Sequence, residues 1–102
     1  MSKPYYEEYS NRALRFYARN PALKMSAPGL KKPDVENWMA CNDVLRGYAS
    51  DERDIIIEVY RLKTTMPESV FTVAAKHNRE TAYVWQLLIK ATRDFAKKRG
   101  LI

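Results

Sequence analysis

Hydrophobic residues recur at spacings of three and four along most of this 102-residue chain, which predicts an all-α fold of four to five helices. The clearest apolar stripe lies near the C-terminus and consists of Val84, Leu87, Leu88, Ala91 and Phe95. The chain has only three glycines, and its five prolines lie between the periodic segments or at their first positions. This usage favours helices over a turn-rich sheet.

The N-terminal third predicts a helix followed by the one clear linker. A helix is expected over residues 4–19, with an apolar stripe formed by Tyr6, Tyr9, Ala13, Phe16 and Tyr17. Residues 20–33 hold three prolines and one glycine, and Leu23, Met25 and Leu30 are spaced among them. We therefore expect an ordered connection that packs on a surface.

A second helix is expected over residues 34–46. Its stripe consists of Val35, Trp38, Met39, Asn42 and Leu45. Gly47 follows the last periodic residue, where glycine often ends a helix in the left-handed conformation. The only cysteine, Cys41, lies in this helix and is expected to be a small buried residue.

The next predicted helix starts with Ser50 as its N-cap and ends near Lys63. Its buried face is expected to consist of Ile55, Ile56, Val59, Tyr60 and Leu62. Thr65 and Glu68 then have the spacing of a capping box, which opens a short helix over residues 67–76. The packing residues of this short helix are expected to be Val70, Phe71, Val73 and Ala74.

A tight turn centred on His77 and Asn78 leads from the short helix into a long basic one. Asn78 falls where the backbone needs a positive φ angle, which asparagine tolerates well. His77 is expected to be a helix-end or packing residue. The long helix begins near Glu80, runs to about Arg99 and stops at Gly100.

This order of a helix, a short helix, a turn and a long helix matches a helix-turn-helix, which places its second helix in the major groove of DNA. The predicted organisation is an N-terminal helix and linker over residues 1–33 and a helical domain over residues 34–102. The domain would contain the helix-turn-helix at about residues 50–100, so that the C-terminal three-helix unit carries an N-terminal helical extension.

The charge of the chain favours a polyanionic partner. The formal net charge is +6 and the isoelectric point is about 9.6. Basic residues follow the start of the last helix, with Asp94 as their only acidic neighbour: Lys90, Arg93, Lys97, Lys98 and Arg99. The alternative is that these charges form a solvated surface.

Enzymatic, metal-binding and membrane functions find little support in the residues. One cysteine and one histidine do not make a disulfide or a structural zinc site, and no phosphate-binding loop or hydrolase motif occurs. We expect no enzyme activity, cofactor or metal. No apolar run approaches the length of a membrane span, and the first residues lack a signal-peptide pattern. The expected location is the cytoplasm.

Three segments of the second half resemble region 4 of sigma-70-type factors. Residues 50–56 (SDERDII) are similar to the opening of its first helix, and residues 73–78 (VAAKHN) occupy the place of its I-A-x-x-L-G motif. Residues 81–91 resemble its recognition helix. The chain is also similar to small phage regulators of the late-gene activator type, RinA-like and ArpU-like. The resemblance covers about half of the chain and implies a helix-turn-helix that binds DNA.

Several positions depart from the family pattern. His77 and Arg79 stand where the family has apolar residues, and Glu80 stands where it has a serine or threonine N-cap. The outward positions of the recognition helix, usually rich in arginine or lysine, are Thr81, Ala82, Trp85 and Gln86.

The leading hypothesis is a DNA-binding transcriptional regulator or sigma-like factor encoded by a phage or mobile element. Gln86 is the candidate for a base edge, because an amide can bond adenine through two hydrogen bonds. Thr81, Tyr83 and Trp85 would lie on or near the same front, while Arg79, Lys90, Arg93 and Lys76 would contact phosphate. Double-stranded DNA is the expected partner, with RNA polymerase and a second copy of the chain as further candidates.

The alternative hypothesis is a helical protein-interaction module that keeps the fold without binding DNA. It rests on Trp85, since an outward tryptophan more often packs against another helix or subunit than against a base. Tyr83 would belong to the same face. For the charged residues of the site, the alternative to phosphate contact is that they are simply solvated.

Overall fold

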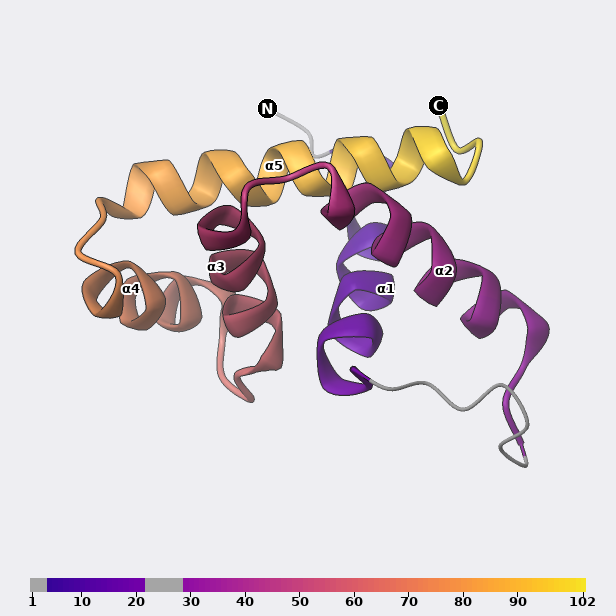
Figure 1. Cartoon of the computed structure of the whole chain (residues 1–102), viewed down its shortest axis with the longest axis horizontal. Coiled ribbons are helices and arrows are strands. Elements are labelled where there is room, and N and C mark those ends of the chain that lie inside the picture. Colours follow the sequence, from indigo (N-terminus) through magenta and orange to yellow (C-terminus); the bar gives the residue numbers. More distant parts are fainter. Residues whose placement is uncertain (1–3, 22–28) are drawn as a thin grey trace.

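Five α-helices make up the computed structural model of the chain, which describes residues 4–21 and 29–102 (Figure 1). The helices are α1 (Glu7–Arg19), α2 (Lys32–Arg46), α3 (Ser50–Arg61), α4 (Met66–Lys76) and α5 (Thr81–Lys98). The all-α prediction is therefore confirmed. In Figure 1, α5 runs across one side of the molecule, and the other four helices lie beneath it. None of the helices in the described ranges has both the length and the apolar character needed to cross a membrane.

One hydrophobic core joins all five helices. Each contributes a large side chain that is at most 1% exposed: Leu14, Leu45, Ile56, Val70 and Phe95, in chain order. Helix α1 packs against α2, α3 and α5, so the N-terminal helices share the core of the C-terminal unit. Residues 22–28, which make up half of the predicted ordered connection, lie outside the described residues.

The predicted inner face of α1 is wrong by about one residue. The buried residues are Ser10, Ala13, Leu14 and Ala18, whereas Tyr9 is 39% exposed and Tyr6, Phe16 and Tyr17 are half-buried. Small side chains at this face let α1 approach α2 and α3 closely. The tyrosines lie at the rim, where the hydroxyl of Tyr17 donates to Asn42 (3.0 Å), because a phenol packs its ring and keeps its hydroxyl near a polar partner.

The predicted face of α2 is also displaced, and of its five predicted residues only Leu45 is buried. Its buried residues are Asn37, Ala40, Cys41 and Leu45, and Met39 is 49% exposed. Cys41 is fully buried, as expected, and burial raises the pKa of its thiol to about 12.

Two helix boundaries near the middle of the chain differ from the prediction. Gly47 ends α2 with φ −79°, which is not left-handed, and its N–H donates to the Val44 carbonyl (3.1 Å). Ala49 is the N-cap of α3 in place of Ser50, and its N–H donates to the Glu52 carboxylate (3.0 Å). Alanine has no side-chain acceptor, so this cap is supplied by Glu52 alone. The buried face of α3 is as predicted except for Leu62, which is half-buried beyond the helix end.

Helix α4 exposes one of its predicted packing residues. The Thr65 side chain caps the helix by accepting from the Glu68 N–H (3.4 Å), as the capping spacing predicts. The Glu68 carboxylate accepts from the Thr64 hydroxyl, so the box is only half formed. Phe71 is 69% exposed, while Ser69 is buried. Because α4 has its main contacts with α3 and α5 only, its covered stripe is narrow.

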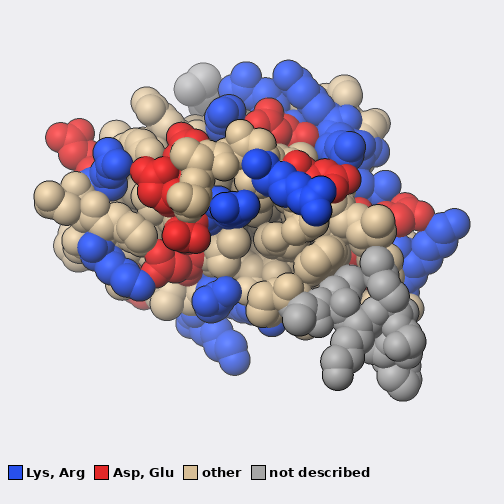
Figure 2. Space-filling model, in the orientation of Figure 1, with Lys and Arg blue, Asp and Glu red and all other residues tan. Residues whose placement is uncertain are grey.

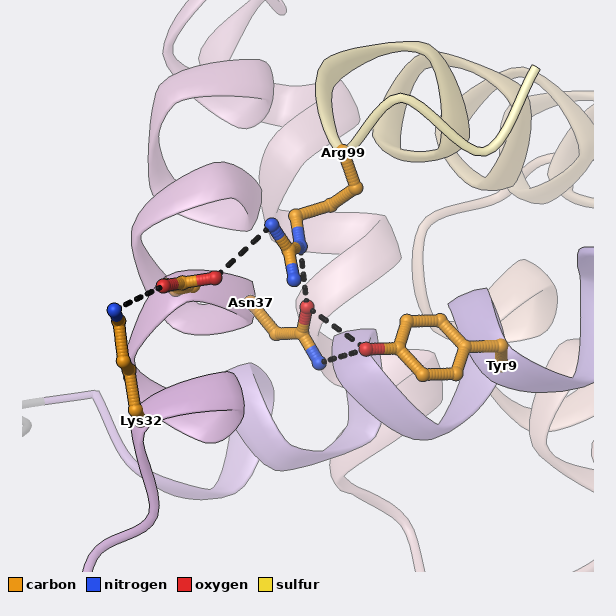
Figure 3. A network of polar contacts seen from close by, with 5 residues as sticks. Tyr9, Lys32, Asn37 and Arg99 are labelled. Carbon is orange, nitrogen blue, oxygen red and sulfur yellow. Dashed lines mark hydrogen bonds and ion pairs between the residues drawn. The ribbon is translucent and has the colours of Figure 1, made fainter.

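A polar network ties the N-terminal helices to the end of α5 (Figure 3). Arg99 Nε donates to Asn37 Oδ1 (2.8 Å), and the Asn37 amide donates to the Tyr9 hydroxyl (3.0 Å). The guanidinium also lies 3.2 Å from Glu36, whose carboxylate faces Lys32 at 3.9 Å. These contacts join α1, α2 and the C-terminal end of α5 at one point.

Candidate nucleic-acid interface

The turn between α4 and α5 has the backbone geometry of a Schellman motif. His77 is the C-cap of α4, and Asn78 follows in the left-handed conformation with φ +54°, as predicted. The Arg79 N–H donates to the Ala74 carbonyl (2.9 Å) and the Asn78 N–H donates to the Ala75 carbonyl (3.2 Å). This motif fixes the direction in which α5 leaves α4.

The first half of α5, residues 81–89, presents uncharged side chains to solvent. We call these residues the leading half. Its inward face is the predicted one, since Val84, Leu87 and Leu88 are buried. The outward residues are Thr81, Ala82, Trp85, Gln86 and Ile89. The start of the helix is therefore open within this chain.

The second half of α5, residues 90–98, presents basic side chains. We call these residues the trailing half. Its exposed residues are Lys90, Arg93, Lys97 and Lys98, and every one of them is cationic. Figure 2 shows lysine and arginine gathered along the upper edge of the molecule, toward the C-terminal end of α5. One helix thus carries an uncharged segment followed by a charged one.

Arg79 and Tyr83 form a stacked pair beside the leading half. The guanidinium lies 4.9 Å from the centre of the Tyr83 ring, and it is 3.5 Å from Asp51. Tyr83 is half-buried, so its ring supports Arg79 and offers less open surface than Gln86. An exposed ion pair of this kind stabilises by about 0–1 kcal/mol, which a phosphate group can replace.

Lys76 and His77, at the end of α4, share the carboxylate of Glu58 on α3. Partial burial of Glu58 opposes its ionisation, but hydrogen bonds from Lys76 and His77 outweigh that effect and hold its pKa below the usual range. His77 is thus both a helix end and a packing residue. Glu58 partly neutralises the charge that Lys76 would offer to DNA.

Lys90 is positioned by a contact with the loop between α2 and α3. Its ammonium lies 4.6 Å from the centre of the Tyr48 ring, and the Tyr48 hydroxyl donates to Asp94 (2.6 Å). Burial and the bond to Asp94 raise the pKa of Tyr48. Arg93 lies one turn further along the exposed face of α5.

The predicted site residues therefore fall into three groups. Thr81, Trp85 and Gln86 are exposed on the leading half. Lys90 and Arg93 lie at the start of the trailing half. Lys76 and Arg79 lie near the turn and pair with carboxylates of α3, while Tyr83 stacks with Arg79. Sequence reasoning missed Ile89, which is 56% exposed, and did not include Lys97. Both continue the series of exposed residues at spacings of three and four that starts with Ala82 and Gln86.

The described residues also form two open hollows along α1, of about 320 Å³ beside Tyr5 and about 310 Å³ between Phe16 and Asn37. A shallow depression of about 190 Å³ lies between α3 and α4 and includes Glu58, Leu62 and Thr72 in its lining. Among residues 4–21 and 29–102, no group of three His, Cys, Asp or Glu side chains comes close enough together to hold a metal ion.

Comparison with protein-family models, curated proteins and solved structures gives no match for this chain. The resemblance to sigma-factor region 4 therefore stays a prediction.

Proposed function

We propose that this chain is a DNA-binding transcriptional regulator or sigma-like factor of the kind that phages and mobile elements encode. In this proposal the leading half of α5 enters the major groove, and α4 lies across its edge. The function is binding, without catalysis or a cofactor. Transcription of bacterial and phage genes takes place in the cytoplasm, so the proposal also implies that location.

The observation that supports the proposal best is the division of α5 into an uncharged leading half and a basic trailing half. A helix of 18 residues is about 27 Å long, whereas the major groove is about 12 Å wide. Only part of α5 can therefore lie among the base edges. The rest must cross the sugar-phosphate backbone, where Arg93 and Lys97 have the charge that phosphates require.

Within this arrangement the side chains have separate roles. Gln86 reads a base edge, with Thr81 and Trp85 beside it, while Lys90 and Arg93 bind phosphate. Two further cations contact phosphate near the turn. Arg79, which stacks on Tyr83, leaves Asp51 to do so, and Lys76 leaves Glu58.

Selection of bound duplexes from a random pool, followed by affinity measurements at about 50 and 200 mM salt, tests the proposal. A protein with several phosphate contacts loses orders of magnitude in affinity between these concentrations. Gln86→Ala is expected to relax base preference, and Lys90→Ala or Arg93→Ala to weaken all sequences alike and lower the salt slope by about 1.

Lys32→Ala is the matched control for the charge substitutions. This lysine is 87% exposed and lies on α2, near Glu36. Its removal is expected to leave the salt slope nearly unchanged. Equal, sequence-independent effects of Gln86→Ala and Lys90→Ala would contradict the assigned roles.

The second candidate function is a protein-interaction module. It is favoured by three exposed apolar side chains on α4 and α5: Phe71 is 69% exposed, Ile89 56% and Trp85 37%. RNA polymerase and a second copy of the chain are the proposed protein partners, and a dimer would strengthen the DNA affinity of so small a module. Failure to bind heparin or mixed-sequence DNA at low salt would favour this second function.

A further inference from the structure

Three outward side chains of the leading half form a single stripe. Ala82, Gln86 and Ile89 follow one another at spacings of four and three, and all three are exposed. At about 1.5 Å per residue the stripe is about 10 Å long, which corresponds to about three base-pair steps of about 3.4 Å. This length fits within the width of the major groove.

The stripe and the residues within its span have no charged side chains. Residues 81–89 contain no Lys, Arg, Asp or Glu. Guanine is commonly read by Arg or Lys, and cytosine by Asp or Glu, so the side chains that select G·C pairs are missing from this segment. Gln86 is instead suited to the N6 and N7 groups of adenine. Ala82 and Ile89 offer only apolar surface, which suits the methyl group of thymine.

The nearest exposed cations on the same helix lie beyond the stripe or to its side. Arg93 follows Gln86 by about 10 Å along the axis, and the Lys90 ammonium lies over the Tyr48 ring. These cations are therefore placed for phosphate contacts at the border of the stripe. Base selection within the groove is left to the amide and the two apolar side chains.

We infer that the leading half of α5 recognises A·T pairs, with Gln86 bonding an adenine and with Ala82 and Ile89 contacting thymine methyl groups on neighbouring pairs. The inference rests on the proposed DNA-binding function and adds its target class. The selected duplexes should share a core of about three or four A·T pairs.

Replacing thymine by uracil in the selected duplex tests the methyl contacts directly, since it removes only the methyl group from the base. Each contacted methyl group corresponds to about a fourfold change in affinity. We expect the native chain to bind the uracil duplex several-fold more weakly. Ile89→Ala should lose about fourfold of the preference for thymine and keep the part that Ala82 contributes. Gln86→Ala should lose about tenfold of its preference for adenine over guanine.

Met39→Ala is the matched apolar control. Met39 is 49% exposed, close to the 56% of Ile89, and it lies on α2. This variant should discriminate thymine from uracil as the native chain does. Circular dichroism on each variant checks that the fold is kept.

Each outcome has a distinct meaning. Equal binding of thymine and uracil duplexes by the native chain, or thymine discrimination that Ile89→Ala does not reduce, would overturn the inference. A selected core of G·C pairs would also overturn it and would leave the DNA-binding function standing. If no duplex is retained at low salt, both the inference and the proposed function fail.

Discussion

The two halves of α5 belong to one continuous helix but have different neighbours. Beneath the leading half lie α3 and the short helix α4, whereas α1 and α2 lie beneath the trailing half (Figure 1). The trailing half buries Phe95 and Ala96 completely, and the Phe95 ring lies 6.3 Å from that of Tyr9. The leading half leaves Gln86, Trp85 and Ile89 open.

The N-terminal helices α1 and α2 pack against the trailing half in the core. They also contact its end through the network of Arg99, Asn37 and Tyr9 (Figure 3). The leading half packs on α3 and α4 instead and buries one face there, which carries Val84, Leu87 and Leu88.

Phe95→Ala should have the largest effect on stability. The side chain is fully buried in the core, and such a truncation reduces the free energy of unfolding by about 3–5 kcal/mol. Ile89→Ala on the leading half is the paired substitution and should change the unfolding free energy by less than about 0.5 kcal/mol. Urea denaturation of both variants measures the difference. Similar losses for both would contradict the burial of Phe95 and the exposure of Ile89.

Asn37→Ala should have a smaller effect at the held end of α5. It removes the amide that bonds Tyr9 and Arg99, which is expected to reduce the unfolding free energy by about 1–3 kcal/mol. Lys32→Ala, at the exposed end of the same network, should change it by less than about 0.5 kcal/mol. A change in DNA base preference for Asn37→Ala would show that the network does more than hold the helix.

Asn78→Ala tests the turn that sets the direction of the leading half. Alanine at φ +54° is strained, and the expected loss of unfolding free energy is about 1 kcal/mol. Asn78→Gly should keep the stability within a few tenths of that of the native chain, because glycine adopts this conformation freely. Thermal unfolding by circular dichroism compares the two variants. Equal losses would mean that the left-handed conformation is not what the position requires.

Glu58→Gln should have the smallest effect, and one that depends on pH. The pKa of Glu58 is lowered in the fold, so its stabilising effect is complete above the ordinary glutamate range. That effect is lost as pH falls through the lowered value. The native chain and Glu58→Gln should therefore differ by about 1 kcal/mol or less near neutral pH and converge in acid, as measured by denaturation at several pH values. A difference that grows in acid would contradict this account.

Much of the C-terminal half could be predicted from the residues in order. The periodicity of α5 identified all five of its predicted core positions, and Asn78 was recognised as the left-handed residue of the turn. Ile89 lies outside the predicted apolar stripe, but it was missed because the outward positions compared with the family pattern ended at Gln86. The pairing of Lys76 with Glu58 was missed because the partners are distant in sequence.

The positions of the helices and of the turn between α4 and α5 follow from local sequence, since apolar spacing, caps and turn residues act over a few residues. The tertiary structure decided which faces are covered. Helices α1 and α2 turned small side chains inward and left Tyr9 and Met39 outside, because close helix packing favours small residues at the contact. It also decided that Trp85, Gln86 and Ile89 stay exposed, because α3 and α4 cover only the face of the leading half that carries Val84, Leu87 and Leu88.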